Sequence, residues 1–149
     1  MIKKQKTEST IKEIYKFTKT KSLERPLLGS NVPAGFPSPA QDYIEASLDL
    51  NEFLIPHPNA TFFVRVEGYS MQNAGILPDD LLIVDRALEA GNHRIVIAIV
   101  DGELTVKRLS IVDGMYWLLP ENDNYSPIRI DENIDFVIWG VVTYVIHKV

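Results

Sequence analysis

The Asp101-Gly102 pair is the feature that most restricts how this chain can fold. It lies between two runs rich in Val, Ile and Leu, residues 95–100 and 103–109. A two-residue Asp-Gly connection is typical of a type I′ β-hairpin, because both turn residues must adopt positive φ. We therefore expect an antiparallel hairpin over residues 95–109, and its turn sets which residues of the two strands lie opposite one another.

This register places a lysine among apolar residues. Val96 is expected opposite Lys107 and Ala98 opposite Thr105, with Lys107 and Thr105 on one face and Val106 on the other. A lysine packed in this way loses hydration, which disfavours its ammonium form and lowers its pKa from about 10.4. A neutral lysine can accept a proton and act as a general base. The alternative is an ordinary surface lysine that protects a strand edge from aggregation.

The rest of the chain also predicts strands. The 149 residues are 46% hydrophobic, enough for one domain with a single core. Alternating or continuous apolar runs predict strands at residues 61–66, 81–84, 95–100, 103–109, 115–119 and 136–147. Residues 43–53 fit either a helical turn or an extended segment. A mostly β domain is therefore expected over residues 43–149, preceded by an N-terminal arm, residues 1–42.

Prolines and glycines interrupt the end of this arm. Residues 26–39 are uncharged and contain Pro26, Gly29, Pro33, Gly35, Pro37 and Pro39. Prolines remove backbone donors and push the preceding residue into extended conformations, so we expect an extended, mobile linker. Before it, residues 10–18 fit a short helix or a strand equally well. The arm is too short and too poor in apolar residues for a helix-turn-helix.

Charge divides the arm from the body. Residues 1–25 contain eight Lys or Arg against three Glu, a net charge of +5, whereas the whole chain is −5, which leaves −10 for residues 26–149. A basic arm on an acidic body either lies on that body, contacts a polyanion or is simply solvated. The acidic body argues against direct, sequence-specific DNA binding by the domain itself.

Several other functional classes are disfavoured. The chain has no cysteine, so a disulfide framework and a thiolate metal site are excluded and a cytoplasmic location is expected. His57, His93 and His147 are too scattered to suggest metal ligands, and we expect neither a metal nor another cofactor. The lysine-rich N-terminus is not followed by an apolar run, so no secretory signal is expected. The longest apolar run, residues 136–146, is too short to span a bilayer as a helix.

A turn with a serine supplies a possible nucleophile for the lysine. Ser70 follows Gly68 and Tyr69 and precedes Met71. Most serines in such positions only serve turn formation. Here, however, Gly68 permits a tight backbone, Met71 can close an apolar wall, and the N–H groups of the turn could form an oxyanion hole. Ser70 with Lys107 would then make a nucleophile and base pair that needs no histidine.

At this point the residues resemble a known family. The segments that carry the resemblance are 66–71 (VEGYSM), 75–76 (GI), 79–85 (DDLLIVD), 100–109 (VDGELTVKRL), 35–43 (GFPSPAQDY) and 125–128 (YSPI). They are similar, in order and at compatible spacing, to the nucleophile and base segments of the UmuD and LexA family of self-cleaving Ser-Lys peptidases, and the last two resemble UmuD in particular. The resemblance runs from about Ala34 to the C-terminus and implies a LexA/signal-peptidase-like β domain.

The resemblance also implies a function. Proteins like UmuD act in SOS mutagenesis: they form homodimers and cut themselves when a RecA filament on single-stranded DNA binds them. The shortened form joins a UmuC-type polymerase for translesion synthesis. By this match Ser70 is the nucleophile, Lys107 the general base and Ala34-Gly35 the bond that is cut. UmuD commonly has Cys-Gly at that bond, and this arm is longer and more basic than expected.

Two other functions remain open from the residues. One is a damage-regulated, repressor-like protein of the same fold whose basic arm contacts DNA. The other is a non-enzymatic β binding domain in which Ser70 and Lys107 are ordinary turn and edge residues. Membrane-bound signal peptidases also use Ser and Lys, but the sequence shows no transmembrane anchor.

Overall fold

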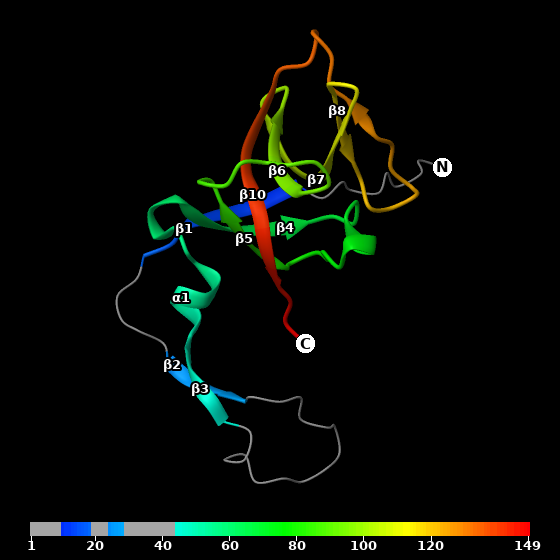
Figure 1. Ribbon diagram of the computed structural model, residues 1–149. Helices are drawn as coiled ribbons and strands as arrows, with labels where there is room; N and C mark the ends of the chain where they lie inside the picture. Colours follow the sequence, from blue (N-terminus) through cyan, green and yellow to red (C-terminus); the bar gives the residue numbers. More distant parts are fainter. Residues whose placement is uncertain (1–9, 19–23, 29–43) are drawn as a thin grey trace. The chain divides into compact units, whose positions relative to one another are not determined.

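The chain forms two compact units in a computed structural model that describes residues 10–18, 24–28 and 44–149 (Figure 1). One unit comprises Met1–Phe17 with Asn59–Val149, and the other comprises Thr18–Pro58. Ala34 and Gly35, the two residues of the predicted cleavage bond, lie outside the described residues.

The larger unit is an antiparallel sheet, so the predicted mostly β fold is confirmed. Its strands follow the order β1-β4-β5-β10-β6-β7-β8-β9 across the sheet. Their bounds are β1 (Thr10–Lys16), β4 (Thr61–Glu67), β5 (Leu81–Asp85), β6 (Ile95–Val100), β7 (Glu103–Val112), β8 (Met115–Leu119), β9 (Ile128–Arg129) and β10 (Phe136–Ile146). The predicted strands are all present with ends shifted by a few residues, whereas the two-residue strand β9 was not predicted.

The sheet closes on itself through β1. This strand pairs with β4 along its length, and at its first residue Thr10 also pairs with Thr105 of β7. The strands β1-β4-β5-β10-β6-β7 therefore form a ring, from which β8 and β9 extend beyond β7 (Figure 1). Residues 10–16, for which the sequence allowed helix or strand, are thus a strand that completes a small barrel.

The central hairpin forms as its turn predicts. Asp101 has φ 48° and Gly102 has φ 83°, the positive values that a type I′ turn requires. The observed pairs include Val96 with Lys107 and Ala98 with Thr105. The predicted register is therefore confirmed.

Apolar side chains from the strands fill the inside of the larger unit. One cluster of buried residues consists of Val64, Val66, Met71, Ile76, Leu82, Val84, Ile97, Val106 and Val142. A second consists of Val96, Ala98, Leu109 and Leu118. Because β7 contributes to both clusters, it is buried on both faces, and a polar side chain on this strand needs partners within the protein.

Strand β10 bends where it passes from β6 to β5. Its pairing shifts between Ile138 and Gly140 with β6, and again between Val142 and Tyr144 with β5. A Cβ atom on Gly140 would lie 2.5 Å from the Val84 side chain. Glycine is therefore required for the close approach of β10 to β5 at this bend.

The smaller unit contains a two-stranded pairing and a short helix. Strand β2 (Glu24–Leu28) pairs antiparallel with β3 (Ile44–Asp49), and α1 (Leu50–Leu54) follows. The 3-10 turn η2 (Pro58–Ala60) spans the boundary in the chain between the two units. The Asp49 carboxylate caps α1 by accepting a hydrogen bond from the Asn51 N–H at 2.9 Å. The ambiguous segment 43–53 is thus a strand followed by a helical turn.

The predicted linker begins inside this unit. Residues 26–28 belong to β2, with Pro26 paired opposite Ser47, so these three residues are part of a strand. Proline is tolerated in such a strand where no ladder partner needs its N–H. The remaining linker residues, 29–39, lie outside the described residues, in the connection between β2 and β3.

Candidate active site

Ser70 lies in the turn that leaves β4. Gly68 has φ 85°, a conformation that glycine adopts without strain, and the short 3-10 turn η3 (Gln72–Ala74) follows. Within the turn the Gln72 N–H donates to the Tyr69 carbonyl at 3.2 Å. The Ser70 side chain is fully buried, although the neighbouring Tyr69 side chain is 50% exposed. The turn therefore points the serine into the protein.

Lys107 approaches this serine from β7. Its side chain has no exposed surface, and its Nζ lies 3.3 Å from the Ser70 Oγ. The distance between the two side chains is within hydrogen-bond reach, as the Ser-Lys interpretation requires. A lysine at this depth is unusual, since removing an ammonium group from water is costly unless polar groups surround it.

Thr105 is a second partner of the lysine. Its Oγ1 accepts a hydrogen bond from Lys107 Nζ at 2.8 Å, a shorter contact than that to Ser70. Both side chains project from the same face of β7, because alternate residues of a strand share a face. The sequence showed this shared face, but only the structure shows that the hydroxyl is a ligand of the ammonium group.

The loop that follows β8 makes hydrogen bonds to the backbone of the Ser70 turn. The Glu121 N–H donates to the Ser70 carbonyl at 2.8 Å, and the Asn73 N–H donates to the Glu121 carbonyl at 2.9 Å. The Asn122 side chain, 5% exposed, donates through Nδ2 to the Tyr69 carbonyl at 2.9 Å. These contacts fix the two carbonyls that flank the serine. Sequence reasoning did not identify Glu121 or Asn122.

An ion pair ties this loop to the strand of the lysine. Arg108 follows Lys107, and its Nε contacts the Glu121 carboxylate. Its Nη1 also donates to the His93 carbonyl at 2.7 Å. Because Glu121 holds the Ser70 turn and Arg108 belongs to β7, the ion pair links the two elements that carry Ser70 and Lys107.

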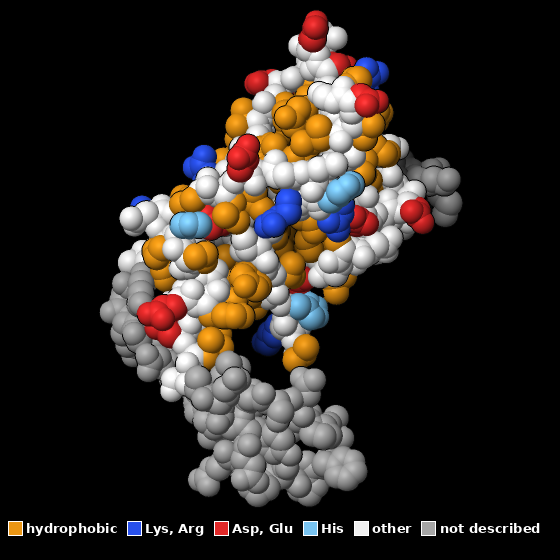
Figure 2. All heavy atoms as spheres, viewed as in Figure 1, with side chains coloured by type: hydrophobic (Ala, Val, Ile, Leu, Met, Phe, Trp, Pro, Cys, Tyr) orange, Lys and Arg blue, Asp and Glu red, His pale blue; other side chains and the backbone are white. Residues whose placement is uncertain are grey.

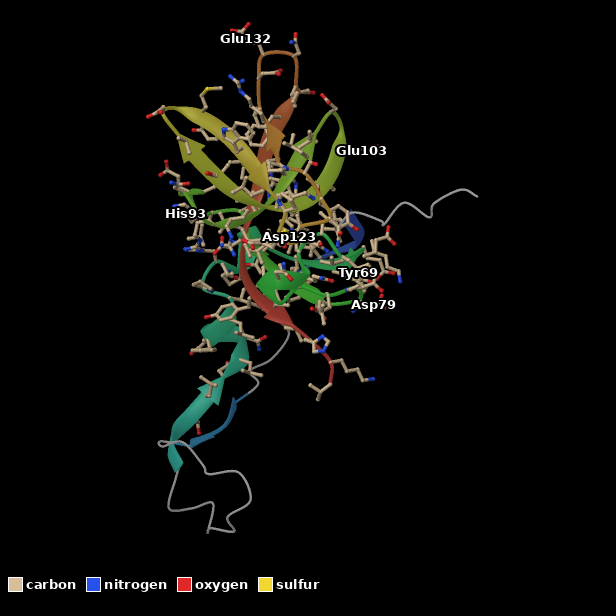
Figure 3. The ribbon with its side chains drawn as sticks, turned by 90° about the vertical axis from the view of Figure 1, so that its right-hand side faces the viewer. Tyr69, Asp79, His93, Glu103, Asp123 and Glu132 are labelled. Carbon is tan, nitrogen blue, oxygen red and sulfur yellow. The ribbon has the colours of Figure 1, made fainter. Side chains whose placement is uncertain are left out.

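The structure thus brings two of the predicted site residues into contact and leaves the roles of the others untested. Ser70 and Lys107 are adjacent, and Gly68, Tyr69 and Met71 surround the serine in the chain. The Met71 side chain is fully buried in the larger apolar cluster. Tyr69 lies on the same side of the larger unit as Asp79 (Figure 3). The oxyanion role of this turn and the cleavage at Ala34-Gly35 stay predictions.

Neither a metal centre nor a membrane span is found in the described part of the chain. Among residues 10–18, 24–28 and 44–149, no three His, Cys, Asp or Glu side chains are grouped so that they could hold a metal ion. No helix within these ranges is long and apolar enough to cross a membrane.

A buried serine and lysine in contact within a mostly β domain have the arrangement that a Ser-Lys peptidase requires. The Peptidase S24-like family model matches residues 26–143, and the chain belongs to this family. Protein ImpA of Salmonella typhimurium is 49% identical over 85% of this chain and 86% of its own length. Protein SamA of Salmonella typhimurium strain LT2 is 49% identical over 83% and 85%. Protein MucA of Escherichia coli is 43% identical over 80% and 82%. The chain is therefore a UmuD-like member of the family.

Proposed function

We propose that this protein is a self-cleaving Ser-Lys peptidase of the DNA-damage response that cuts its own Ala34-Gly35 bond. The observation that carries the proposal is the fully buried Lys107 with its Nζ 3.3 Å from the Ser70 Oγ. Family membership supports the same chemistry. A buried Ser-Lys contact has no evident structural benefit that apolar side chains could not supply.

The reaction begins with the loss of a proton from Lys107. In its ammonium form the lysine donates to both Ser70 and Thr105 and cannot act as a base. Once neutral, its Nζ accepts the Ser70 hydroxyl proton while Oγ attacks the carbonyl carbon of Ala34. The same proton then passes to the Gly35 nitrogen as the peptide bond breaks. Water afterwards hydrolyses the Ser70 ester in a step in which Lys107 again serves as the base.

Because the bond that is cut lies on the same chain as the dyad, a modest catalyst is sufficient. Intramolecular positioning can be worth an effective concentration of about 10⁵ M. Control then lies in the fraction of time that Ala34-Gly35 spends at Ser70. A RecA filament on single-stranded DNA would act by stabilising that docked arrangement.

The proposal extends to a wider role that family membership supports. The shortened protein, residues 35–149, acts as the accessory subunit of a UmuC-type translesion polymerase, and the working form is a homodimer. Membership among UmuD-like proteins supports these partners.

The first prediction tests the dyad by mass spectrometry. Wild-type protein incubated at alkaline pH should yield residues 35–149, and the rate should rise with pH as Lys107 loses its proton. Ser70→Ala and Lys107→Ala should each reduce the rate by at least about 10³-fold, since each removes half of a unit that works only together. Circular dichroism checks that both variants fold. A pH-independent rate, or cleavage that persists in folded Ser70→Ala, would contradict the mechanism.

A further inference from the structure

The edge of β4 is covered by a piece of the arm itself. Strand β1 pairs with β4 from Thr10 opposite Glu67 to Lys16 opposite Phe62. Ile11 packs against the larger apolar cluster, and the Phe17 ring contacts the Phe63 ring edge-on, with centroids 5.9 Å apart. These contacts make β1 an integral strand of the larger unit, although most of the chain between β1 and β4 belongs to the other unit.

The contact between β1 and β4 is complementary in charge as well as in shape. The register shifts between Ile11 and Glu13, which leaves Lys12 as an extra residue in a β-bulge. Lys12 Nζ lies 3.3 Å from Asp79 Oδ1, and Glu13 Oε2 lies 3.5 Å from Arg65 Nε. Arg65 of β4 and Asp79 of the turn before β5 therefore offer a base and an acid that match Glu13 and Lys12, two successive residues of β1.

The residues that face β1 in this contact are held in place by other parts of the larger unit. Arg65 Nη1 donates to the Asp79 carbonyl at 2.9 Å. The buried Asp80 carboxylate accepts from the Leu77 N–H at 2.8 Å and contacts His147 Nδ1 at 2.6 Å. Asp79, which appears near Tyr69 in the view of Figure 3, is thus positioned by contacts that do not involve β1.

The proposed cut separates β1 from this site. Ala34-Gly35 lies in the connection between β2 and β3, so cleavage leaves β1 and β2 on a fragment that is no longer covalently joined to β3 and β4. An isolated two-stranded pairing such as β2 with β3 is at best marginally stable. Before cleavage β1 binds intramolecularly; afterwards it binds only as a separate peptide, whose retention depends on concentration.

We infer that the β4 edge, with Arg65 and Asp79, is a binding site for an extended segment of a protein partner, which β1 occupies until the chain is cut. The partner segment adds a strand to the sheet and carries an apolar, a basic and an acidic residue where Ile11, Lys12 and Glu13 stand. Strand addition to an exposed sheet edge is an established mode of peptide recognition. The inference rests on the proposed function for the event that empties the site.

The test separates strand binding from self-cleavage. A recognition sequence for an added protease is inserted between residues 28 and 35 of the full-length Ser70→Ala chain, so that the nick does not depend on Ser70. After the nick, the N-terminal fragment that contains β1 is removed by gel filtration. Binding of a fluorescent peptide of residues 8–18 to the remaining protein is then measured by anisotropy. It should bind the nicked protein at least about tenfold more tightly than the intact protein, in which β1 competes intramolecularly.

Two peptide variants and one protein variant identify the contact. A peptide with proline at both Ile14 and Tyr15 should not bind, because successive N–H groups point to opposite edges and one of the two must face β4. Asp79→Asn keeps a residue that tolerates the positive φ of this position, 71°. This substitution should weaken binding of the wild-type peptide by up to about fivefold, as expected for a partly exposed ion pair. It should leave the affinity of a Lys12→Gln peptide unchanged.

Three outcomes would overturn the inference. They are equal binding of the proline peptide, equal binding to intact and nicked protein, and dimerisation of the nicked protein that the peptide does not reverse, which would mean that a second copy covers the edge by other contacts. Failure of wild-type protein to cut itself would overturn the proposed function but not the peptide site.

Discussion

At the scale of single residues, Thr105 contacts the candidate base directly. Its hydroxyl accepts from Lys107 Nζ at 2.8 Å, and a hydrogen bond to the charged form of a group favours that form. Thr105→Val should therefore let Lys107 lose its proton at lower pH and shift the midpoint of the cleavage pH profile downward. The rate at the plateau should fall about tenfold or more, because Nζ is less well held. Thr105→Ser is the control and should keep the wild-type midpoint. An unchanged midpoint in Thr105→Val would show that the hydroxyl does not act on the lysine.

At the scale of elements, the bend of β10 depends on the absence of a side chain at Gly140. A Cβ there would lie 2.5 Å from Val84 and 3.2 Å from Arg86, so Gly140→Ala should lower the free energy of unfolding by about 1–3 kcal/mol. Gly91→Ala is the matched control, because a Cβ at Gly91 meets nothing within 4 Å. Urea denaturation of both variants measures the difference. Similar midpoints for the two would contradict the close approach of β10 to β5.

At the scale of the whole molecule, charge and cleavage are connected. Removing residues 1–34 takes away a net charge of +5 and leaves a body of −10. In Figure 2 acidic side chains gather at the top of the visible face, over the loop that leads into β10. The shortened form should therefore bind a UmuC-type polymerase more tightly than full-length Ser70→Ala, with an affinity that falls as salt rises. Surface plasmon resonance at two salt concentrations measures both effects. Equal affinity of the two forms would mean that the arm is not the switch.

The sequence by itself determined the fold class and one strand register. Asp101-Gly102 requires a turn with two positive φ angles, and this local requirement placed Lys107 opposite Val96 before any tertiary contact was known. The Ser-Lys pairing was also predictable, because a lysine beside apolar residues and a serine in a glycine turn are local patterns, and the segment resemblance joined them. Their catalytic roles stay predictions.

The tertiary structure decided what local patterns leave open. Residues 10–16 fit a helix or a strand, and pairing with β4 selected the strand. The roles of Glu121 and Asn122 depend on a loop distant in sequence that folds behind Ser70, and the Thr105 bond depends on the depth at which Lys107 is buried. The position of Lys12 against Asp79 depends on a bulge that no composition or spacing signals. Local conformational preferences act over a few neighbouring residues and so can be read along the chain, whereas these contacts join residues far apart in sequence and exist only once the sheet has closed.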